Sequence, residues 1–496
     1  MLFGIDFGTT RTIVAQADRG NYPIVSFTDE DGDPQEYYPS VVAWQGEELI
    51  HGFAAREAAR QGSPAVRSFK RALGEPSANP GTMLEIGDRS LPLIDVLTGY
   101  LMALRAAIEA ELGDIGTPRA VVSVPAHAHG AQRFITLEAF RRAGFEVIAM
   151  LNEPSAAGFE YTHRQPRTLT SRRTQVVVYD LGGGTFDASL VEADGTSHAV
   201  LGSVGVNRLG GDDFDTVLAE VALAQAGRRA GSLATSELEA LVDDCREAKE
   251  RLAPQSKRIA LEVAGVPLVV AVDDFYAAAA PLVEQSLAVM DDLVASLSED
   301  ESLAAVAGIY LVGGGSGLPL VSRLLRQRFG RRVHRSPYPA ASTAIGLAIA
   351  ADPASGYSLT DRLSRGFGVF RERDAGRSLG FDEIFSRDAV LPEDGVLTVT
   401  RRYLAAHNLG WFRYVEYTAV DAAGEPRGDL APFAEVLFPF DPALQGGGSL
   451  ADVTVERCDG GLVEERYRLD ANGLIEVTIT DLTTGYSQTH ALGSRA

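Results

Sequence analysis

The sequence predicts a duplicated α/β unit followed by an antiparallel β-sandwich. Two hairpins at residues 2–15 and 175–190 share one plan, in which a buried strand, a carboxylate and a glycine-containing turn lead into a second strand. Up to about residue 352, buried strands alternate with helical segments, as in α/β lobes. Beyond that point helical periodicity stops, and short alternating segments separated by turn residues indicate a β-sandwich.

The mid-chain hairpin shows what such a turn could do. Asp180 ends a predicted buried strand, at the strand end where sheets of this kind place ligands. Glycines 182–184 allow a sharp turn that presents backbone N–H groups to an anion. Thr185 and Asp187 add a hydroxyl and a second carboxylate. The hairpin fits either a phosphate cradle with carboxylates for hydrated Mg²⁺ or an ordinary tight turn.

The N-terminal hairpin favours the phosphate cradle because it repeats the plan. Asp6, Gly8, Thr9 and Thr10 form a second Asp-x-Gly turn rich in threonine, between two apolar strands. Two such hairpins suggest two lobes that grip a polyphosphate between them. The chain contains no Walker Gly-Lys-Ser/Thr element and no G-x-G-x-x-G after a strand, which argues against P-loop and Rossmann domains.

Composition limits the classes of partner. A chain of 496 residues predicts two or three domains. Its 45 Lys+Arg against 67 Asp+Glu give a net charge of −22, which argues against nucleic acid or an anionic membrane as the main partner. Two cysteines predict neither a disulfide framework nor a cysteine-based metal site. Since no signal-like or membrane-spanning stretch is recognisable, we expect a cytoplasmic protein.

Other residues could serve a phosphate site. Lysine occurs only at Lys70, Lys249 and Lys257, and a lysine retained in an arginine-rich chain can mark a need for a compact ammonium group, although any one could be neutral. Glu153 follows a strand end, where it could orient a water or simply favour a helix start through the dipole. The glycine turn at residues 313–314 could face a nucleotide or merely connect strand to helix.

Taken together, these segments resemble the DnaK-type seventy-kilodalton heat-shock chaperones, which have an actin-like ATPase domain. The matching segments occur in the family's order: 4–10, 69–71, 124–126, 152–157, 180–187, 209–215, 312–314 and, in the sandwich, 469–477. The resemblance spans nearly the whole chain. It implies an α/β actin-like ATPase domain with two duplicated lobes at 1–170 and 171–352, a linker at 353–365, and an all-β, substrate-binding-like sandwich domain at 366–496.

The resemblance also implies roles for single residues. Metal ligation of hydrated Mg²⁺ would fall to Asp6, Asp180 and Asp187. Catalysis would fall to Lys70, Glu153, Asp180 and Thr185, with Lys70 and Glu153 positioning the attacking water. Binding of ATP or ADP would involve Gly8, Thr9, Thr10, Gly182, Gly183, Gly184, Thr185, Gly210, Gly211, Lys249, Gly313 and Gly314.

The chain departs from the family at the adenosine end. Arg246 replaces an acid, Gly317 a base-stacking arginine and Ala340 a carboxylate, so we expect altered adenine recognition. Arg246 and Glu250 are interpreted as an i,i+4 pair on a solvated helix face. The linker is polar where the family's is rich in leucine, which argues against coupling through a docked linker. We expect the family's helical lid to be absent after the sandwich.

The leading hypothesis is therefore a lidless, DnaK-like chaperone that hydrolyses ATP and binds unfolded or extended polypeptide. Co-chaperones and a nucleotide exchange factor are further partners that the family implies. One alternative is a nucleotide-gated scaffold with little turnover, and another is a small-molecule kinase of the actin-like superfamily, against which the sandwich argues. Four aromatic residues could line a peptide groove but are more typical of a sandwich core: Trp411, Phe412, Tyr414 and Tyr417.

Overall fold

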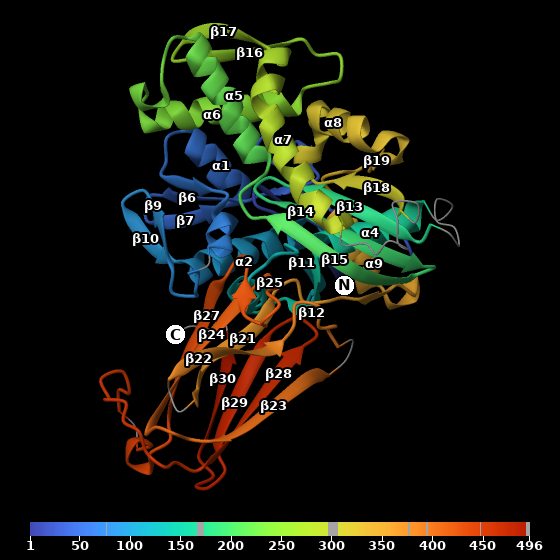
Figure 1. The fold of residues 1–496 in the computed structure, drawn as a ribbon. Helices are drawn as coiled ribbons and strands as arrows, with labels where there is room; N and C mark the ends of the chain where they lie inside the picture. The colour runs from blue at the N-terminus through green and yellow to red at the C-terminus, as the bar shows by residue number, and fades with distance from the viewer. Residues whose placement is uncertain are drawn as a thin grey trace.

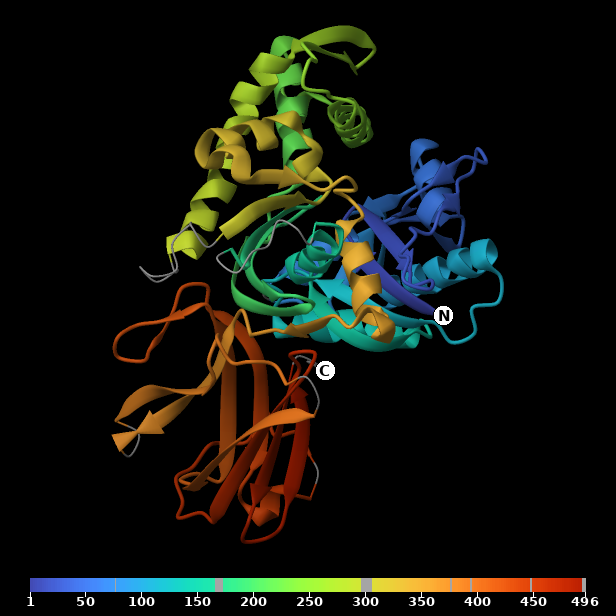
Figure 2. The ribbon, with the colours of Figure 1, turned by 90° about the vertical axis from the view of Figure 1, so that its right-hand side faces the viewer.

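The computed structural model describes residues 1–75, 77–165, 173–295, 306–374, 377–392, 395–446 and 448–492. Two α/β lobes lie together at one end of the molecule, and an elongated all-β domain projects from them (Figure 1). The turned view shows the β-domain contacting the lobes at one of its ends only (Figure 2). The described helices include none long and apolar enough to cross a membrane.

The first lobe is built on a five-stranded sheet of order β12-β11-β1-β2-β5. Its strands are β1 (Leu2–Phe7), β2 (Arg11–Gln16), β5 (Tyr38–Pro39), β11 (Arg119–Val124) and β12 (Glu146–Asn152). β1 and β2 form the predicted antiparallel hairpin, and β11 runs parallel to β1. Helices of this lobe are α1 (Gly52–Arg60), α2 (Leu93–Leu112), α3 (Gly130–Arg142) and α4 (Glu153–Arg164). Smaller strands are β6 (Val41–Gln45), β7 (Glu48–His51), β8 (Ala65–Arg67), β9 (Met83–Ile86) and β10 (Arg89–Pro92).

The second lobe repeats this plan in a six-stranded sheet of order β19-β18-β13-β14-β15-β20. Its strands are β13 (Gln175–Leu181), β14 (Phe186–Asp194), β15 (Ser197–Val206), β18 (Val306–Val312), β19 (Val333–Arg335) and β20 (Ser358–Thr360). As in the first lobe, the first strand of the hairpin pairs with a parallel strand, here β18. Helices α5 (Gly211–Gln225), α6 (Thr235–Glu250), α7 (Val272–Ala295) and α8 (Pro319–Phe329) complete the lobe with the hairpin β16 (Arg258–Val263) and β17 (Val266–Ala271). The predicted duplication is thus present.

Helix α9 (Ser342–Ala351) follows the strands of the second lobe in the chain but packs on the first lobe. It packs on α4 and on β1, and a Cβ at either Gly346 or Gly4 would collide with the facing backbone. The small side chains of this alanine-rich helix therefore allow the close approach that holds the lobes together.

The linker pairs with the second lobe, although its polar sequence argued against coupling through a docked linker; the coupling itself stays a prediction. β20 adds to the sheet of the second lobe as a parallel partner of β15, with Ser358 opposite Ser197. Tyr357, just before β20, stacks on His198 with ring centroids 5.5 Å apart, and its ring lies 5.2 Å from that of Phe159. Backbone pairing and one aromatic anchor thus replace the leucines that the sequence lacks, because ladder hydrogen bonds do not depend on side-chain polarity.

The β-domain is the predicted antiparallel sandwich. Its two sheets have the orders β22-β21-β24-β27 and β23-β28-β29-β30. The strands are β21 (Gly366–Arg373), β22 (Ser378–Phe385), β23 (Val396–Leu404), β24 (Leu409–Tyr417), β27 (Ala431–Pro439), β28 (Leu462–Asp470), β29 (Ile475–Asp481) and β30 (Ser487–Leu492). Phe412, Tyr414 and Tyr417 are buried as expected of core residues, whereas Trp411 is 54% exposed, so its assignment to the core is wrong.

Candidate active site

A cavity between the lobes is lined by most of the predicted site residues. These are Asp6, Gly8, Thr9, Thr10, Lys70, Glu153, Asp180, Gly182, Gly183, Thr185, Gly211, Lys249, Gly313 and Gly314. Three predicted residues are not part of the lining: Gly184, Gly210 and Asp187. Residues separated by up to 308 positions, from Asp6 to Gly314, therefore meet at one place.

The two phosphate loops face each other across the cavity. In the first loop Gly8 N–H donates to the Asp6 carbonyl at 3.0 Å, and in the second Gly182 N–H donates to the Thr185 carbonyl at 2.9 Å. A Cβ on Gly183 would lie 2.7 Å from the hydroxyl oxygen of Thr10. Glycine is thus required where the two loops approach each other, because a side chain at Gly183 would collide with Thr10.

Lys70 and Glu153 form a buried ion pair at the base of the cleft. Lys70 lies in the short 3₁₀ turn Phe69–Gly74, and Glu153 is the first residue of α4. The Lys70 Nζ atom lies 3.0 Å from Glu153 Oε1 and also donates to the Phe7 carbonyl. The two residues are 5% and 8% exposed. Glu153 is therefore more than a helix-start acid, because it faces the cavity with a cationic partner.

The three predicted metal-binding carboxylates crowd around this pair. Burial, reinforced by the charge of Glu153, raises the pKa of Asp6 to about 7 and that of Asp187 to about 8. Burial and the same neighbours hold the pKa of Asp180 well above its ordinary value. Since buried like charges raise one another's pKa, a bound cation would stabilise all of them in the ionised form.

The donor set fits hydrated Mg²⁺. The ion prefers carboxylate oxygens and keeps several of its waters. Asp187 Oδ1 is buried and has no hydrogen-bond partner among the described residues. Within the described part of the chain, no three Asp, Glu, His or Cys side chains converge closely enough to hold a bare ion. Contact through the ion's waters stays a prediction for these side chains.

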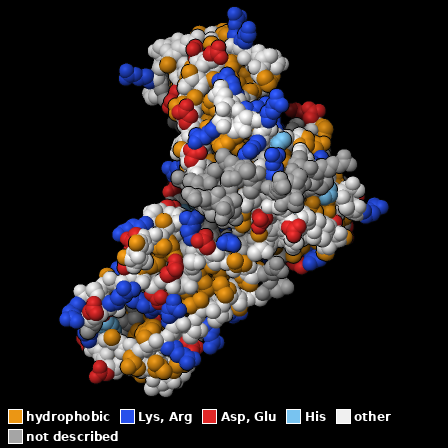
Figure 3. Space-filling model, turned by 45° about the vertical axis from the view of Figure 1, so that its right-hand side comes forward, with side chains coloured by type: hydrophobic (Ala, Val, Ile, Leu, Met, Phe, Trp, Pro, Cys, Tyr) orange, Lys and Arg blue, Asp and Glu red, His pale blue; other side chains and the backbone are white. Residues whose placement is uncertain are grey.

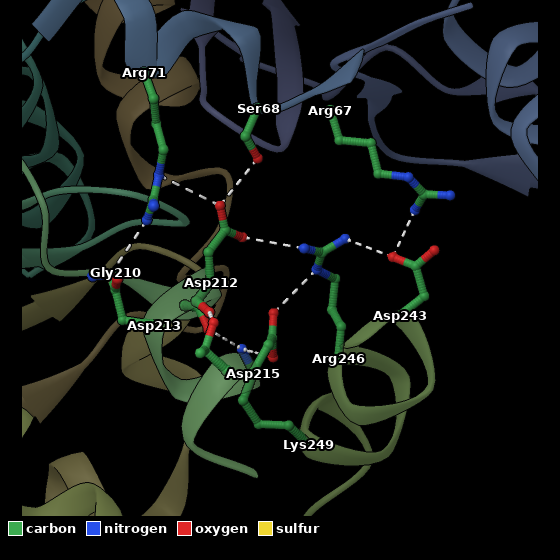
Figure 4. A network of polar contacts seen from close by, with 12 residues as sticks. Arg67, Ser68, Arg71, Gly210, Asp212, Asp213, Asp215, Asp243, Arg246 and Lys249 are labelled. Carbon is green, nitrogen blue, oxygen red and sulfur yellow. Dashed lines mark hydrogen bonds and ion pairs between the residues drawn. The ribbon is translucent and has the colours of Figure 1, made fainter. Parts of the chain in front are cut away.

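At the end of the cavity where the adenosine is expected, the charged side chains bond to one another. Lys249 Nζ lies 2.6 Å from Asp215 Oδ1 and donates to the Gly211 carbonyl at 2.6 Å. Glu250 pairs with Arg11 across the cleft at 2.6 Å. Arg246 contacts three aspartates at 3.1 to 3.3 Å and not Glu250, so the predicted i,i+4 pair is wrong (Figure 4). Sequence reasoning missed Arg11 because its partner lies 239 positions away.

These features decide the family. The family model described as Hsp70 protein matches residues 2–92 and 85–364. The chain belongs to the Hsp70 family. This confirms the recognised family and its fold, an α/β nucleotide-binding region followed by β-rich sheets.

Relatives of this Hsp70-family chain are named as chaperones. It is 30% identical over 517 aligned positions to the chaperone protein HscA of Escherichia fergusonii, covering 97% of this chain and 76% of that relative. It is 35% identical over 376 positions to HscA homologs of Burkholderia pseudomallei and Burkholderia mallei, covering 71% of this chain. The aligned part spans 58% of the length of those Burkholderia relatives.

In this Hsp70-family chain the β-domain reaches the neighbourhood of Glu153. Asn472, in the turn between β28 and β29, accepts from the Met150 N–H at 3.0 Å and from Arg133 at 3.3 Å. Arg133 also donates to Asn152 Oδ1 at 2.6 Å, and Asn152 donates to Asp361 of the linker at 2.9 Å. Asn152 directly precedes Glu153. The β-domain, through Arg133, and the linker therefore contact the residue next to the predicted catalytic carboxylate.

A second docking contact lies at the start of α3. Glu416 of β24 accepts from the backbone N–H of Gly130 at 3.0 Å, at the positive end of the helix dipole. Arg365 lies 3.6 Å from the same carboxylate. The Phe433 ring packs directly against Gly130, where a Cβ would collide with it.

Proposed function

We propose that this chain is an ATP-hydrolysing chaperone whose β-domain binds extended polypeptide under the control of hydrolysis. One observation carries the proposal: the Lys70–Glu153 pair is buried at the base of a cleft between two phosphate loops that face each other. The HscA relatives are named as chaperones, which supports the proposed binding of polypeptide. Unfolded client, co-chaperones and a nucleotide exchange factor are the proposed partners.

The chain's own groups would supply positioning and electrostatics, which dominate phosphoryl transfer. The N–H groups of the two loops, with Thr10 and Thr185, would hold the phosphates. Glu153 would orient the attacking water and draw its proton, while Lys70 would offset the charge on the transferred group. Asp6, Asp180 and Asp187 would hold hydrated Mg²⁺, which neutralises phosphate charge when bound.

The β-domain offers a place for an extended client. Among the described strands β23 lies at the edge of its sheet, so one row of its backbone N–H and C=O groups has no strand partner there and could pair with another chain. Leu397 and Leu404 on this strand are 39% and 70% exposed. Apolar side chains at the surface of the β-domain are visible in Figure 3. These features favour addition of a strand from an extended, apolar segment.

Titration calorimetry with ATP, run beside a phosphate-release assay, separates the candidate functions. An ATPase binds ATP and releases phosphate, whereas tight binding without release indicates the nucleotide-gated scaffold. The scaffold is tested as well because Arg246, Lys249 and Glu250 pair with other side chains of the protein, which leaves them less available to a nucleoside. Phosphate transfer to an added sugar or polyol would instead indicate a kinase and contradict the proposal.

Replacing Gly130 by alanine is expected to undock the β-domain. The new Cβ would collide with the Phe433 ring and lie 3.1 Å from Glu416 Oε1. Small-angle scattering should show a larger radius of gyration, and an extended apolar peptide should no longer change the ATPase rate. Gly448→Ala is the matched control, because a Cβ there meets nothing within 4 Å. A Gly130→Ala protein that stays as compact and as peptide-responsive as the wild type would contradict coupling through this contact.

A further inference from the structure

The turn that carries Lys70 starts from an unusual backbone conformation. Ser68, directly before the 3₁₀ turn Phe69–Gly74, has φ 53° and ψ 29°, in the left-handed region. A residue with a side chain occupies this region at a cost, so surrounding contacts must hold it there. The side chain of Ser68 makes such a contact, and it is with the other lobe.

Both flanks of Lys70 are bonded to the second lobe. Ser68 Oγ donates to Asp212 Oδ2 at 2.9 Å, and Arg71 Nη2 donates to Asp213 Oδ2 at 3.2 Å. Arg71 Nε also lies 3.5 Å from Asp212 Oδ2. Figure 4 shows Ser68 and Arg71 pointing from the first lobe toward these two carboxylates at the start of α5.

The two carboxylates are themselves fixed on the second phosphate loop. The backbone N–H groups of Gly211 and Asp212 donate to the carbonyls of Gly182 and Gly183 at 2.9 and 2.8 Å. Asp213 Oδ2 also accepts from the Gly210 N–H at 2.7 Å. The residues on both sides of Lys70 are therefore bonded, through Asp212 and Asp213, to the loop that would hold the phosphates. These bonds fix the position of Lys70 relative to that loop.

Arg246 holds Asp212 in place from the opposite side. Its guanidinium lies 3.3 Å from Asp212, 3.1 Å from Asp215 and 3.2 Å from Asp243. Asp243 in turn accepts from Arg67 of the first lobe at 2.7 Å. Since the Arg246 side chain is only 21% exposed, solvent screens these contacts less than those of surface pairs.

We propose that Asp212 and Asp213 are positioning residues for Lys70, with Arg246 as their support; this rests on the proposed ATPase function. When the lobes separate, Ser68 and Arg71 lose their partners, the left-handed conformation of Ser68 relaxes, and Lys70 leaves the phosphate loop. Hydrolysis then takes place only in the closed cleft. When the cleft opens for product release, Lys70 no longer lies where it can act on the phosphates.

The test uses Asp212→Asn, Ser68→Ala and the double variant in the full-length chain. Each single change should lower kcat for phosphate release between about tenfold and 10²-fold, as expected for displacement of a catalytic group. The ADP Kd and the melting temperature should stay near the wild-type values. Because both changes remove one contact, the double variant should be no slower than the worse single variant. Asp274→Asn is the matched control, since Asp274 is an exposed acid in the first turn of α7.

Two results would overturn the proposal. One is an unchanged kcat for Asp212→Asn in an active wild-type background. The other is a loss of kcat with equal losses of ADP affinity and thermal stability, or with additive effects of the two changes. If the wild type itself releases no phosphate, the proposed function fails first, and the positioning role fails with it.

Discussion

Replacing Glu153 by glutamine is expected to lower kcat for phosphate release by 10²–10⁴-fold, the range for loss of a group that handles a proton. The amide keeps the shape and can still contact Lys70, but it no longer accepts a proton or carries a charge. Lys70→Ala should lower kcat similarly, because it leaves Glu153 buried without its cationic partner, 3.0 Å away in the wild type. Single-turnover phosphate release separates this loss from slow product release.

Two substitutions serve as controls for this prediction. Glu146→Gln removes a carboxylate from the first residue of β12, where its pair with Arg119 is solvent-exposed. Lys257→Ala removes the exposed one of the chain's three lysines. Both should retain the wild-type rate. Wild-type rates for Glu153→Gln and Lys70→Ala would show that the chemistry does not occur at this pair.

Replacing Glu465 by leucine should destabilise the β-domain by about 3 kcal/mol, the lower end of the cost of breaking a buried ion pair, because Arg371 keeps a second partner in Asp382. Glu465 is 0% exposed and accepts from Arg371 at 2.9 and 2.6 Å. The hydroxyls of Tyr403 and Tyr467 also donate to it. Although burial lowers it, hydrogen bonding to Glu465 raises the pKa of Arg371 overall. Glu465→Leu would remove this two-oxygen partner and leave the largely buried cation with Asp382, 2.7 Å away.

Urea unfolding monitored by Trp411 fluorescence measures this effect in the β-domain. The chain has two tryptophans, so a Trp44→Phe background leaves Trp411 as the reporter. Glu476→Leu on β29 is the matched control, because its pair with Arg468 is exposed and should contribute about 0–1 kcal/mol. Adding Arg371→Met to Glu465→Leu should recover stability, since the cation that lost its buried partner is then absent and Asp382 keeps its pair with Arg401. A loss below about 1 kcal/mol for Glu465→Leu would show that the pair is not needed.

Local patterns predicted the parts of the site that lie within single hairpins. Asp6 to Thr10 and Asp180 to Asp187 are strand-turn-strand units, and the glycines that they need are visible in the sequence. Their repetition predicted two lobes. Lys70 and Glu153 were candidates from composition and from position at a strand end, and the family resemblance supplied their roles. The structure adds that they face each other at 3.0 Å.

Partners distant in sequence could not be predicted in the same way. Arg246 was assigned to Glu250 because the i,i+4 rule considers one helix only, whereas three aspartates from α5 and α6 surround it. The polar linker argued against coupling through a docked linker because side-chain hydrophobicity was the criterion. The pairing of Ser358 with Ser197 is made by the backbone and does not depend on side-chain hydrophobicity. Glu465 gave no sign of being buried, because a charged residue on a strand is ordinarily solvated.

The sequence by itself determined the order of the elements, the two phosphate hairpins and the change from α/β lobes to a sandwich. These properties depend on local periodicity and on glycine, which act over a few residues. Only the tertiary structure decided how the lobes meet, through α9 and the Asp212–Arg246 network, and how the β-domain docks beside Asn152. The reason is physical: ion pairs and close backbone approaches between lobes depend on three-dimensional distance, which sequence separation does not encode.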